Sequence, residues 1–284
     1  MRNFTFKGLL LTAVFMLLGC LSIQAANDDL ITKQITINLD KAGTLPNKIA
    51  SSEMYKITNL EIIGEINGTD WNMIREMAGR DNRGYGTEGK LSVLDLSEAK
   101  IVAGGDYYYD DNLFNNKVYT SNDEIGEYAF YGCSGLTSLT LPVGITSIGE
   151  FAFSGCSGLT SLTLPAGITS IGEFAFSYCS GLTSIYVYAE KVPRIGRYAF
   201  EGCASRKCTL YVPKGTYDNY RLSEFGYFEN IVEFDATGID KTTTSTDVEE
   251  VSRYSLNGQR LAVPVKGLNI VKYSDGTVRK VVVK

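Results

Sequence analysis

The sequence predicts a repeat solenoid, in which short structural units of one design stack along an axis. The first observation is a near-duplication: residues 125–147 and residues 148–170 differ at three of their 23 positions. The second is a Leu-x-x-Leu-x-Leu spacing within these units, whose last two apolar positions are two residues apart. That spacing is typical of a β-strand with one buried face. A short fixed period indicates units that bury their apolar sides only by stacking on their neighbours.

Four units can be aligned, and each opens on Ile-Gly and has a Cys eight positions after the Ile. They start at Ile125, Ile148, Ile171 and Ile195. We expect one short strand per coil, so that stacked strands form a parallel ladder at roughly 4.8 Å per coil. The Ile-Gly-Glu-Phe-Ala-Phe part of the unit is too short for a long helix, and its Gly suits a tight turn. The predicted interior of the second unit comprises Ile148, Phe153, Cys156, Leu159, Leu162 and Leu164.

Diverged coils extend the prediction on both sides of the clear repeats. The strand spacing recurs at residues 57–62 and 91–96, and its second half recurs at residues 210–213, which makes about six strands. Residues 34–39 predict a capping strand. Residues 71–78 predict one amphipathic helix, which Thr69 or Asp70 would open and Gly79 would end.

The motif order IG-x-x-AF-x-x-C-x-x-L-x-x-L-x-LP resembles the BspA-like, treponemal-type leucine-rich repeat family of bacterial surface proteins. The resemblance covers about residues 31–234. The stretches GKLSVLDLSEAKIVAGGDYYY and YVPKGTYDNYRLSEFGYFENIVEF resemble the first coils and the terminal cap of that family. The resemblance implies a leucine-rich repeat solenoid that mediates adhesion to host matrix proteins or to other bacteria.

The first 26 residues predict a signal peptide, because Arg2 and Lys7 precede an apolar run over residues 8–21. The run is shorter than the ~20 residues that span a bilayer, so no transmembrane span is expected. Two processing routes remain open. The stretch LLGC ending at Cys20 resembles a lipobox, which implies a lipid anchor, whereas the small residues Ala25 and Ala26 suit ordinary cleavage. Either route predicts an exported protein, attached to the outer membrane or cell surface or released outside the cell.

The rest of the chain divides into three parts. Residues 27–235 are predicted to form the solenoid with its caps, and residues 236–250, rich in Thr, Ser and Asp, a linker. Residues 251–284 predict a small antiparallel β unit, because Asn-Gly at 257–258 and Asp-Gly at 275–276 are hairpin turns. This segment resembles the C-terminal sorting modules of type IX-secreted proteins, although it is shorter. A β appendage without a sorting role is the alternative.

Composition and charge exclude several classes of function. The chain has no histidine, so Ser-His and Cys-His catalytic pairs and histidine-containing zinc sites are excluded. Without Arg2 and Lys7, 25 of the 27 basic residues remain against 32 acidic ones, a net charge of −7. A nucleic-acid partner is not expected at that charge. From residue 251 onward, seven basic residues face one acidic residue, which leaves −13 on the body and +6 on the tail.

The cysteines Cys133, Cys156, Cys179 and Cys203 lie one per coil, 23 or 24 residues apart. Metal clusters use cysteines two to four residues apart, so we expect buried thiols that act as small core residues, and no metal or cofactor. A Cys203–Cys208 disulfide stays open, because an exported protein permits it and only geometry decides it.

The outward strand positions predict the binding site, on the concave face of the solenoid. One column through the stacked strands contains Glu61, Asp95, Thr140, Thr163, Tyr186 and Tyr211, with Tyr188 nearby. Tyrosines beside hydroxyls suit a protein loop or stacking on sugars. The column therefore predicts a non-enzymatic binder of another macromolecule, with a glycan-binding module as the alternative. The simpler interpretation is a solvent-exposed face without a binding role, whose Thr and Tyr residues are present because they favour β-strands.

Two further interpretations are weaker. A carboxylate-based glycosidase would use Asp95 and Glu61, but neighbouring strands offer no pocket that excludes water. The segment 103–123 interrupts the period and is rich in Asp and Asn, without the residue order of an EF-hand. We expect a solvated loop there, partly packed by its tyrosines over the edge of a coil.

Overall fold

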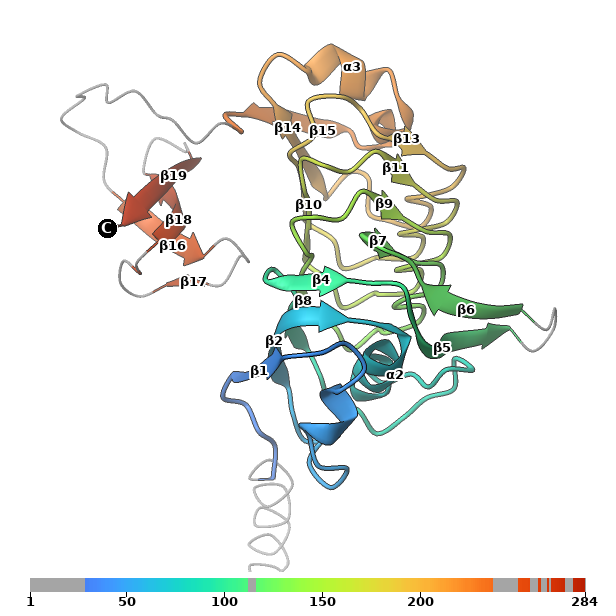
Figure 1. The fold of residues 1–284 in the computed structure, drawn as a ribbon. Helices are drawn as coiled ribbons and strands as arrows, with labels where there is room; N and C mark the ends of the chain where they lie inside the picture. The colour runs from blue at the N-terminus through green and yellow to red at the C-terminus, as the bar shows by residue number, and fades with distance from the viewer. Residues whose placement is uncertain are drawn as a thin grey trace, which may run out of the picture.

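The computed structural model describes residues 29–111, 116–236, 250–255, 260–261, 265, 267–273 and 278–283. The predicted signal peptide with Cys20, most of the predicted linker and both predicted Asn-Gly and Asp-Gly turns lie outside these residues. Residues 29–111 and 116–236 form a solenoid that runs from the N-terminal strands to the C-terminal cap (Figure 1).

The first ladder confirms the predicted stack of parallel strands. Its N-terminal part has the order β1-β2-β3-β8 and its C-terminal part the order β10-β12-β14-β15. The strands are β1 (Ile35–Leu39), β2 (Asn59–Ile66), β3 (Val93–Asp95), β8 (Ser138–Thr140), β10 (Ser161–Leu164), β12 (Ser184–Val187), β14 (Thr209–Pro213) and β15 (Asn230–Phe234). Between β8 and β10 the regular pairing is interrupted, and the amide of Thr160 reaches the carbonyl of Thr137 at 3.4 Å.

Each of the four aligned coils also contains a second strand that the sequence did not predict. The second ladder has the order β13-β11-β9-β7, all parallel. Its strands are β7 (Glu124–Ile125), β9 (Ser147–Ile148), β11 (Ser170–Ile171) and β13 (Arg194–Ile195). Two residues are too few to show an alternating pattern, so the sequence signal was absent. On the third side of the coil, backbone hydrogen bonds join the turns, such as Phe153 N to Ala175 O at 2.7 Å.

The interior contains a column of stacked phenylalanines, one from each coil. The rings of Phe130, Phe153, Phe176 and Phe200 follow one another at centroid distances of 5.3, 5.0 and 5.5 Å. All six interior residues predicted for the second unit are buried, at 0–2% exposure. Stacking therefore provides each coil with the apolar environment that it cannot make alone.

The Gly after each opening Ile has a different role from the predicted one. Gly149 and Gly172 do not have positive φ values. Instead, a Cβ on Gly172 would lie 2.5 Å from the amide nitrogen of Glu150, and a Cβ on Gly149 would lie 2.5 Å from that of Glu127. Glycine is required because adjacent coils approach closely at this point, and a turn conformation is not the reason.

The N-terminal end of the stack is covered by the helix α2 (Gly68–Met77). Its N-cap is Asn67, which forms a capping box with Asp70, so the helix begins earlier than predicted from Thr69 or Asp70. The Asp70 carboxylate also accepts from the amides of Gly43 and Leu45, at 2.6 and 2.8 Å. These bonds attach the helix to the short 3-10 helix η1 (Leu45–Asn47). The strand β4 (Ala99–Ile101) pairs with β2.

The predicted loop at 103–123 is instead an antiparallel hairpin, β5 (Gly104–Asp111) with β6 (Asn116–Thr120). Its tyrosines pack on the first full coil as predicted. Tyr109 stacks on Tyr128 at 4.4 Å and 9°, and the hydroxyl of the buried Tyr108 donates to Glu127 O at 2.8 Å. The sequence missed the hairpin because the segment lacks a clear alternation of apolar and polar residues.

The C-terminal cap contains α3 (Tyr217–Arg221), the 3-10 helix η2 (Glu224–Tyr227) and β15. Phe225 and Phe228 lie against Phe200, at 5.3 and 5.1 Å between ring centroids, and so close the inner phenylalanine column. Because these side chains replace the next coil, the last phenylalanine stays out of water.

The C-terminal residues form the predicted antiparallel unit. The strands β16 (Glu250–Ser255), β17 (Arg260–Leu261), β18 (Gly267–Tyr273) and β19 (Val278–Val283) pair in the order β17-β16-β18-β19. The buried Arg253 donates to the side-chain oxygen of Asn269 at 3.1 Å. Among the described residues, no helix has the length and apolar character needed to cross a membrane.

Candidate binding surface

The outward side of the first ladder, which we call the strand face, contains the predicted column in register. Glu61 pairs with Asp95 and Asp95 with Thr140. In the C-terminal part, Thr163 pairs with Tyr186 and Tyr186 with Tyr211. The column continues beyond the prediction to Thr36 at one end and to Val232 at the other. The sequence spacing therefore brought together the residues it named, while their role in binding stays a prediction.

The acidic end of the column is engaged in contacts within the protein. Glu61 accepts hydrogen bonds from Gln34 at 2.8 Å and from Thr36 at 2.6 Å, both on one carboxylate oxygen. Asp95 is 8% exposed and accepts from the amide of Ser97 at 2.9 Å. Asp95 therefore helps to form the turn after β3, and little of its side chain is exposed to a partner.

The middle of the strand face carries hydroxyls of two kinds. Thr137, Thr160 and Thr183 donate to the carbonyl of the preceding coil, at 3.0, 3.3 and 3.0 Å. These three threonines therefore stabilise the stack. Thr140 and Thr163 are half-buried, and their hydroxyls make no hydrogen bond to the other residues that the structure describes. Those two hydroxyls remain available to a partner.

The C-terminal end of the strand face is an aromatic cluster of Tyr186, Tyr188, Tyr211 and Phe234. Tyr186 and Tyr211 stack at 4.4 Å and 6°, as register partners on β12 and β14. The ring of Phe234 lies edge-on to Tyr186 and Tyr188, at 6.1 and 5.1 Å. All four rings are half-buried. The cluster therefore has a continuous aromatic surface that no single residue would provide.

Phe234 was missed by reasoning from the sequence. It lies on β15, the last strand of the ladder, two positions after Val232. The alternation of apolar and polar residues in Ile-Val-Glu-Phe was the available signal. So short a pattern predicts a strand, but it does not show which side chains that strand contacts. Burial raises the pKa of Tyr186, with smaller contributions from the hydroxyls of Tyr211 and Tyr188 and from Tyr254 of the C-terminal β unit. Burial also raises the pKa of Tyr188. These hydroxyls stay protonated, and so able to donate hydrogen bonds, at physiological pH.

The cysteine column is part of the core, as predicted. Cys133, Cys156, Cys179, Cys203 and Cys208 are buried and free, so Cys203 and Cys208 form no disulfide in the structure. The thiols of Cys156 and Cys179 donate to the carbonyls of Phe130 and Phe153, both at 3.1 Å. In the described parts of the chain, no group of three or more Cys, Asp or Glu side chains could hold a metal ion.

Comparison with known proteins agrees with the repeat assignment. Residues 103–225 match the family model of the BspA type leucine rich repeat region, in six copies. A search of curated proteins finds no match. Among solved structures, the chain is similar to a leucine-rich repeat protein from Bacteroides ovatus ATCC 8483, with 23% sequence identity and a TM-score of 0.36. The similarity covers 72% of this chain and 42% of that chain.

Leucine-rich repeat proteins in general bind other proteins, and those of the BspA type are typically surface-associated in bacteria. The upstream coils lie outside the matched region, although β1, β2 and β3 continue the same ladder. The parallel ladders and the family match together show a leucine-rich repeat solenoid, whose coils between residues 103 and 225 are similar to the BspA type.

Proposed function

We propose that this chain is an exported, non-enzymatic leucine-rich repeat protein that binds another protein through the aromatic end of its strand face. The observation that supports the proposal is the cluster of Tyr186, Tyr188, Tyr211 and Phe234. Aromatic anchors at the centre of a contact surface carry much of the energy of protein interfaces. Thr140 and Thr163 extend the surface with hydroxyls, and Glu61 lies toward its acidic end.

The ring geometry favours a protein partner over a glycan. Sugar recognition uses an open ring face, whereas the stacked rings of Tyr186 and Tyr211 cover one face of each other. Phe234 approaches Tyr186 and Tyr188 edge-on, which further limits the access of a sugar ring to the faces of these tyrosines. The cluster therefore presents ring edges and hydroxyls, which suit apolar side chains and backbone carbonyls of a protein loop. Glycan binding at Tyr186, Tyr188 and Tyr211 remains the second candidate.

The proposed partner is a protein of the host matrix or of another bacterial surface, as the family resemblance implies. Purified matrix proteins and a glycan array would be probed with the parent chain and with the double variant Tyr186→Ala, Tyr211→Ala. The matched control is Tyr85→Ala with Tyr119→Ala, two exposed tyrosines off the strand face. We expect the strand-face pair to weaken matrix-protein binding at least tenfold, because hot-spot aromatics contribute ~2 kcal/mol or more each. The control pair should leave it unchanged.

Three outcomes separate the candidates. Loss of matrix-protein binding in the strand-face pair alone supports the proposal. Loss of glycan binding alone favours the second candidate. If both kinds of binding survive the strand-face pair, the strand face is not the binding site.

Export and attachment are part of the proposal. Residues 1–26 would act as the signal peptide, residues 27–235 as the binding solenoid, residues 236–250 as a linker and residues 251–284 as a sorting segment. Lipidation at Cys20 would attach the chain to a membrane. Mass spectrometry of the mature N-terminus tests this point, because a lipidated start at Cys20 and an unmodified start at Ala26 or Asn27 differ in mass.

Secretion of a chain cut after residue 250, compared with the parent, tests the sorting role. Loss of secretion without loss of folding supports sorting. Normal secretion of the shortened chain would leave the β unit as an appendage.

A further inference from the structure

The solenoid has a second aromatic surface, on the side away from the strand face. One aromatic residue per coil lies immediately after the Glu or Arg that follows the repeated Ile-Gly. Their rings stack in sequence, from Tyr128 to Phe151 at 5.2 Å, to Phe174 at 5.0 Å and to Tyr198 at 5.2 Å. We call these four residues the outer ridge. Phe151 and Phe174 are half-buried, whereas Tyr198 is 61% exposed.

The backbone of the outer ridge is strained. Tyr128, Phe151, Phe174 and Tyr198 have φ values of 54°, 52°, 52° and 57°. Bulky residues rarely adopt this left-handed conformation, which costs ~1–3 kcal/mol per residue and which Gly or Asn adopts easily. Ring stacking offsets this cost for Phe151 and Phe174, because each has a neighbour on both sides. It offsets less for Tyr198, whose only ring contact in the described residues is with Phe174. Stacking alone therefore does not explain an exposed tyrosine at this position.

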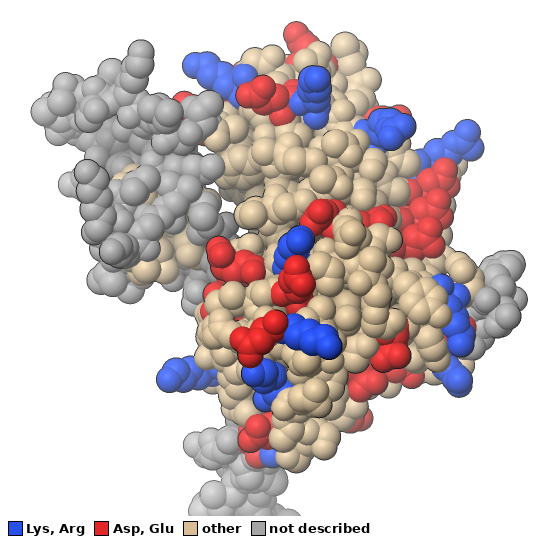
Figure 2. Space-filling model, viewed as in Figure 1, with Lys and Arg blue, Asp and Glu red and all other residues tan. Residues whose placement is uncertain are grey.

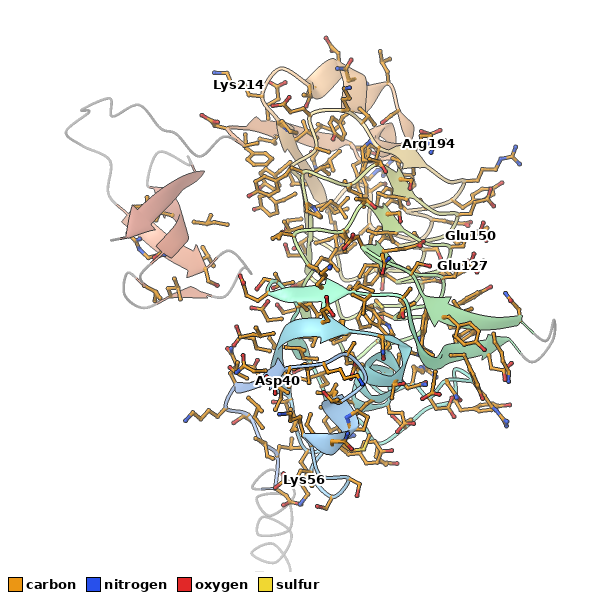
Figure 3. All side chains as sticks on the ribbon, in the orientation of Figure 1. Asp40, Lys56, Glu127, Glu150, Arg194 and Lys214 are labelled. Atoms are coloured by element: carbon orange, nitrogen blue, oxygen red, sulfur yellow. The ribbon has the colours of Figure 1, made fainter. Side chains whose placement is uncertain are left out.

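Carboxylates follow the same line. Glu127, Glu150 and Glu173 each precede a ridge residue, and all three are exposed. Figure 3 shows Glu127 and Glu150 on the side of the solenoid away from β10 and β14. Figure 2 shows Asp and Glu side chains gathered at this edge, above the hairpin of β5 and β6. Among the described residues, the ion pairs involve none of these three carboxylates.

The charge changes sign at the last coil. Arg197 stands where the earlier coils have Glu127, Glu150 and Glu173, and Arg194 stands where the first coil has Glu124. Like charges stacked one coil apart repel one another, so this column is not explained by stability. The side chain of Glu127 is exposed, but partial burial of its carboxyl, followed by the charges of Glu150 and Glu124, raises its pKa.

We infer that the outer ridge is a second protein-binding surface, which takes an extended segment of a partner carrying Lys or Arg side chains. The occupant follows from charge complementarity with the three carboxylates. Alkyl stems of Lys or Arg pack on apolar ring edges while their cationic heads stay in water. The heads would meet Glu127, Glu150 and Glu173. Arg197 would repel a cationic head from the fourth coil, so that the last alkyl stem, beside Glu173, lies on the exposed ring of Tyr198. This surface is independent of the strand face.

The test measures binding of a fluorescent 12-residue peptide of alternating Lys and Ser to the purified full chain, by anisotropy. A peptide of alternating Glu and Ser is the second probe. The triple variant Glu127→Gln, Glu150→Gln, Glu173→Gln should weaken binding of the Lys peptide about tenfold, as expected for three exposed ion pairs. The matched control is Glu53→Gln, Glu98→Gln, Glu190→Gln, which changes the net charge equally at exposed positions away from the ridge. The control should change the affinity less than twofold.

A second variant addresses the aromatic part without damage to the fold. Tyr198→Asn removes the exposed ring and introduces a residue that tolerates the left-handed conformation. We expect at least threefold weaker binding of the Lys peptide and an unchanged melting temperature. The Tyr186→Ala, Tyr211→Ala pair should not alter this affinity, so the two proposed surfaces fail or succeed separately.

Three results would overturn the inference. The parent chain could bind the Lys peptide no better than the Glu peptide. The control triple could weaken binding as much as the ridge triple, which would show a general charge effect. Finally, Tyr198→Asn could leave the affinity unchanged, which would show that the aromatic ring does not contribute to binding.

Discussion

The indole nitrogen of Trp71 donates a hydrogen bond to the carbonyl oxygen of Ala129 at 3.1 Å. In the next coil the equivalent carbonyl, that of Ala152, accepts from the backbone amide of Phe130. No preceding coil of the same kind provides an amide for the Ala129 carbonyl, and the indole of Trp71 takes the place of that amide. Tyr108 does the same for the carbonyl of Glu127, at 2.8 Å. Arg80 donates to the carbonyl of Gly132 at 2.9 Å, which also accepts from the amide of Ser134 in the same turn. The N-terminal helix and hairpin thus satisfy the exposed end of the ladder with side chains.

Arg75 is the most buried member of this cap, and its replacement should destabilise the solenoid. Its guanidinium donates to the carbonyls of Tyr128, Ala129 and Asp81. Burial lowers its pKa. We expect Arg75→Met to lower the free energy of unfolding by about 2–3 kcal/mol, because buried carbonyls lose a charged donor. Denaturant titration measures it, with the exposed Arg83→Met as the control. Equal stability of the two variants would contradict the capping role.

Close contact between coils predicts that Gly172→Ala is strongly destabilising. The new Cβ would lie 2.5 Å from Glu150 N and 2.6 Å from Gly149 C, both backbone atoms that cannot move aside freely. We expect a loss of about 1–3 kcal/mol. Gly135→Ala is the matched control, because a Cβ there meets nothing within 4 Å. A thermal melt of both variants decides the point, and a Gly172→Ala melt like that of the parent would refute it.

Burial of the cysteine column predicts thiols that do not react in the folded protein. Burial raises the pKa of Cys133 and of Cys208 to about 11, and that of Cys203 to about 12. Few thiolates are therefore present at pH 8, and the side chains are shielded from reagents. Alkylation at pH 8 followed by mass spectrometry should leave all five described cysteines unmodified until denaturant is added. Fast labelling of Cys156 without denaturant would contradict the buried ladder.

The raised pKa of the Glu127 carboxyl predicts that the stability of the fold depends on pH. Its pKa is raised in the folded state, so the folded protein binds its proton more tightly than the unfolded chain does. The resulting stabilisation is complete below the unfolded pKa, and it is lost as pH rises through the folded pKa. Glu127→Gln should therefore make stability fall less between pH 4 and pH 7 than in the parent. Thermal melts across this pH range test the direction of the effect. A steeper fall of stability in the variant than in the parent would contradict the prediction.

The strand ladder and its core were predictable from the sequence because they depend on a local period. The spacing of Leu159, Leu162 and Leu164 repeats in neighbouring coils, and identical coils can bury such positions only against one another. The same period located the diverged strands β2, β3 and β14. It also placed Tyr186 beside Tyr211, since one register relates all coils.

Features without a period were not predictable. The hairpin of β5 and β6 and the capping side chains of Trp71 and Arg75 are unique in the chain, so nothing repeats to reveal them. Phe234 joins Tyr186 and Tyr188 only because β15 closes the ladder beside β14.

By itself, the sequence determined that the chain is a stack of like coils, which residues lie inside it, and that histidine chemistry is absent. The tertiary structure alone decided how the ends of the stack are closed, that the glycines serve close contact between coils, and that the outer aromatic residues form a second surface. The physical reason is that burial within a coil depends on residues a few positions apart. Closure and surface stacking depend on contacts between segments that lie far apart in the chain.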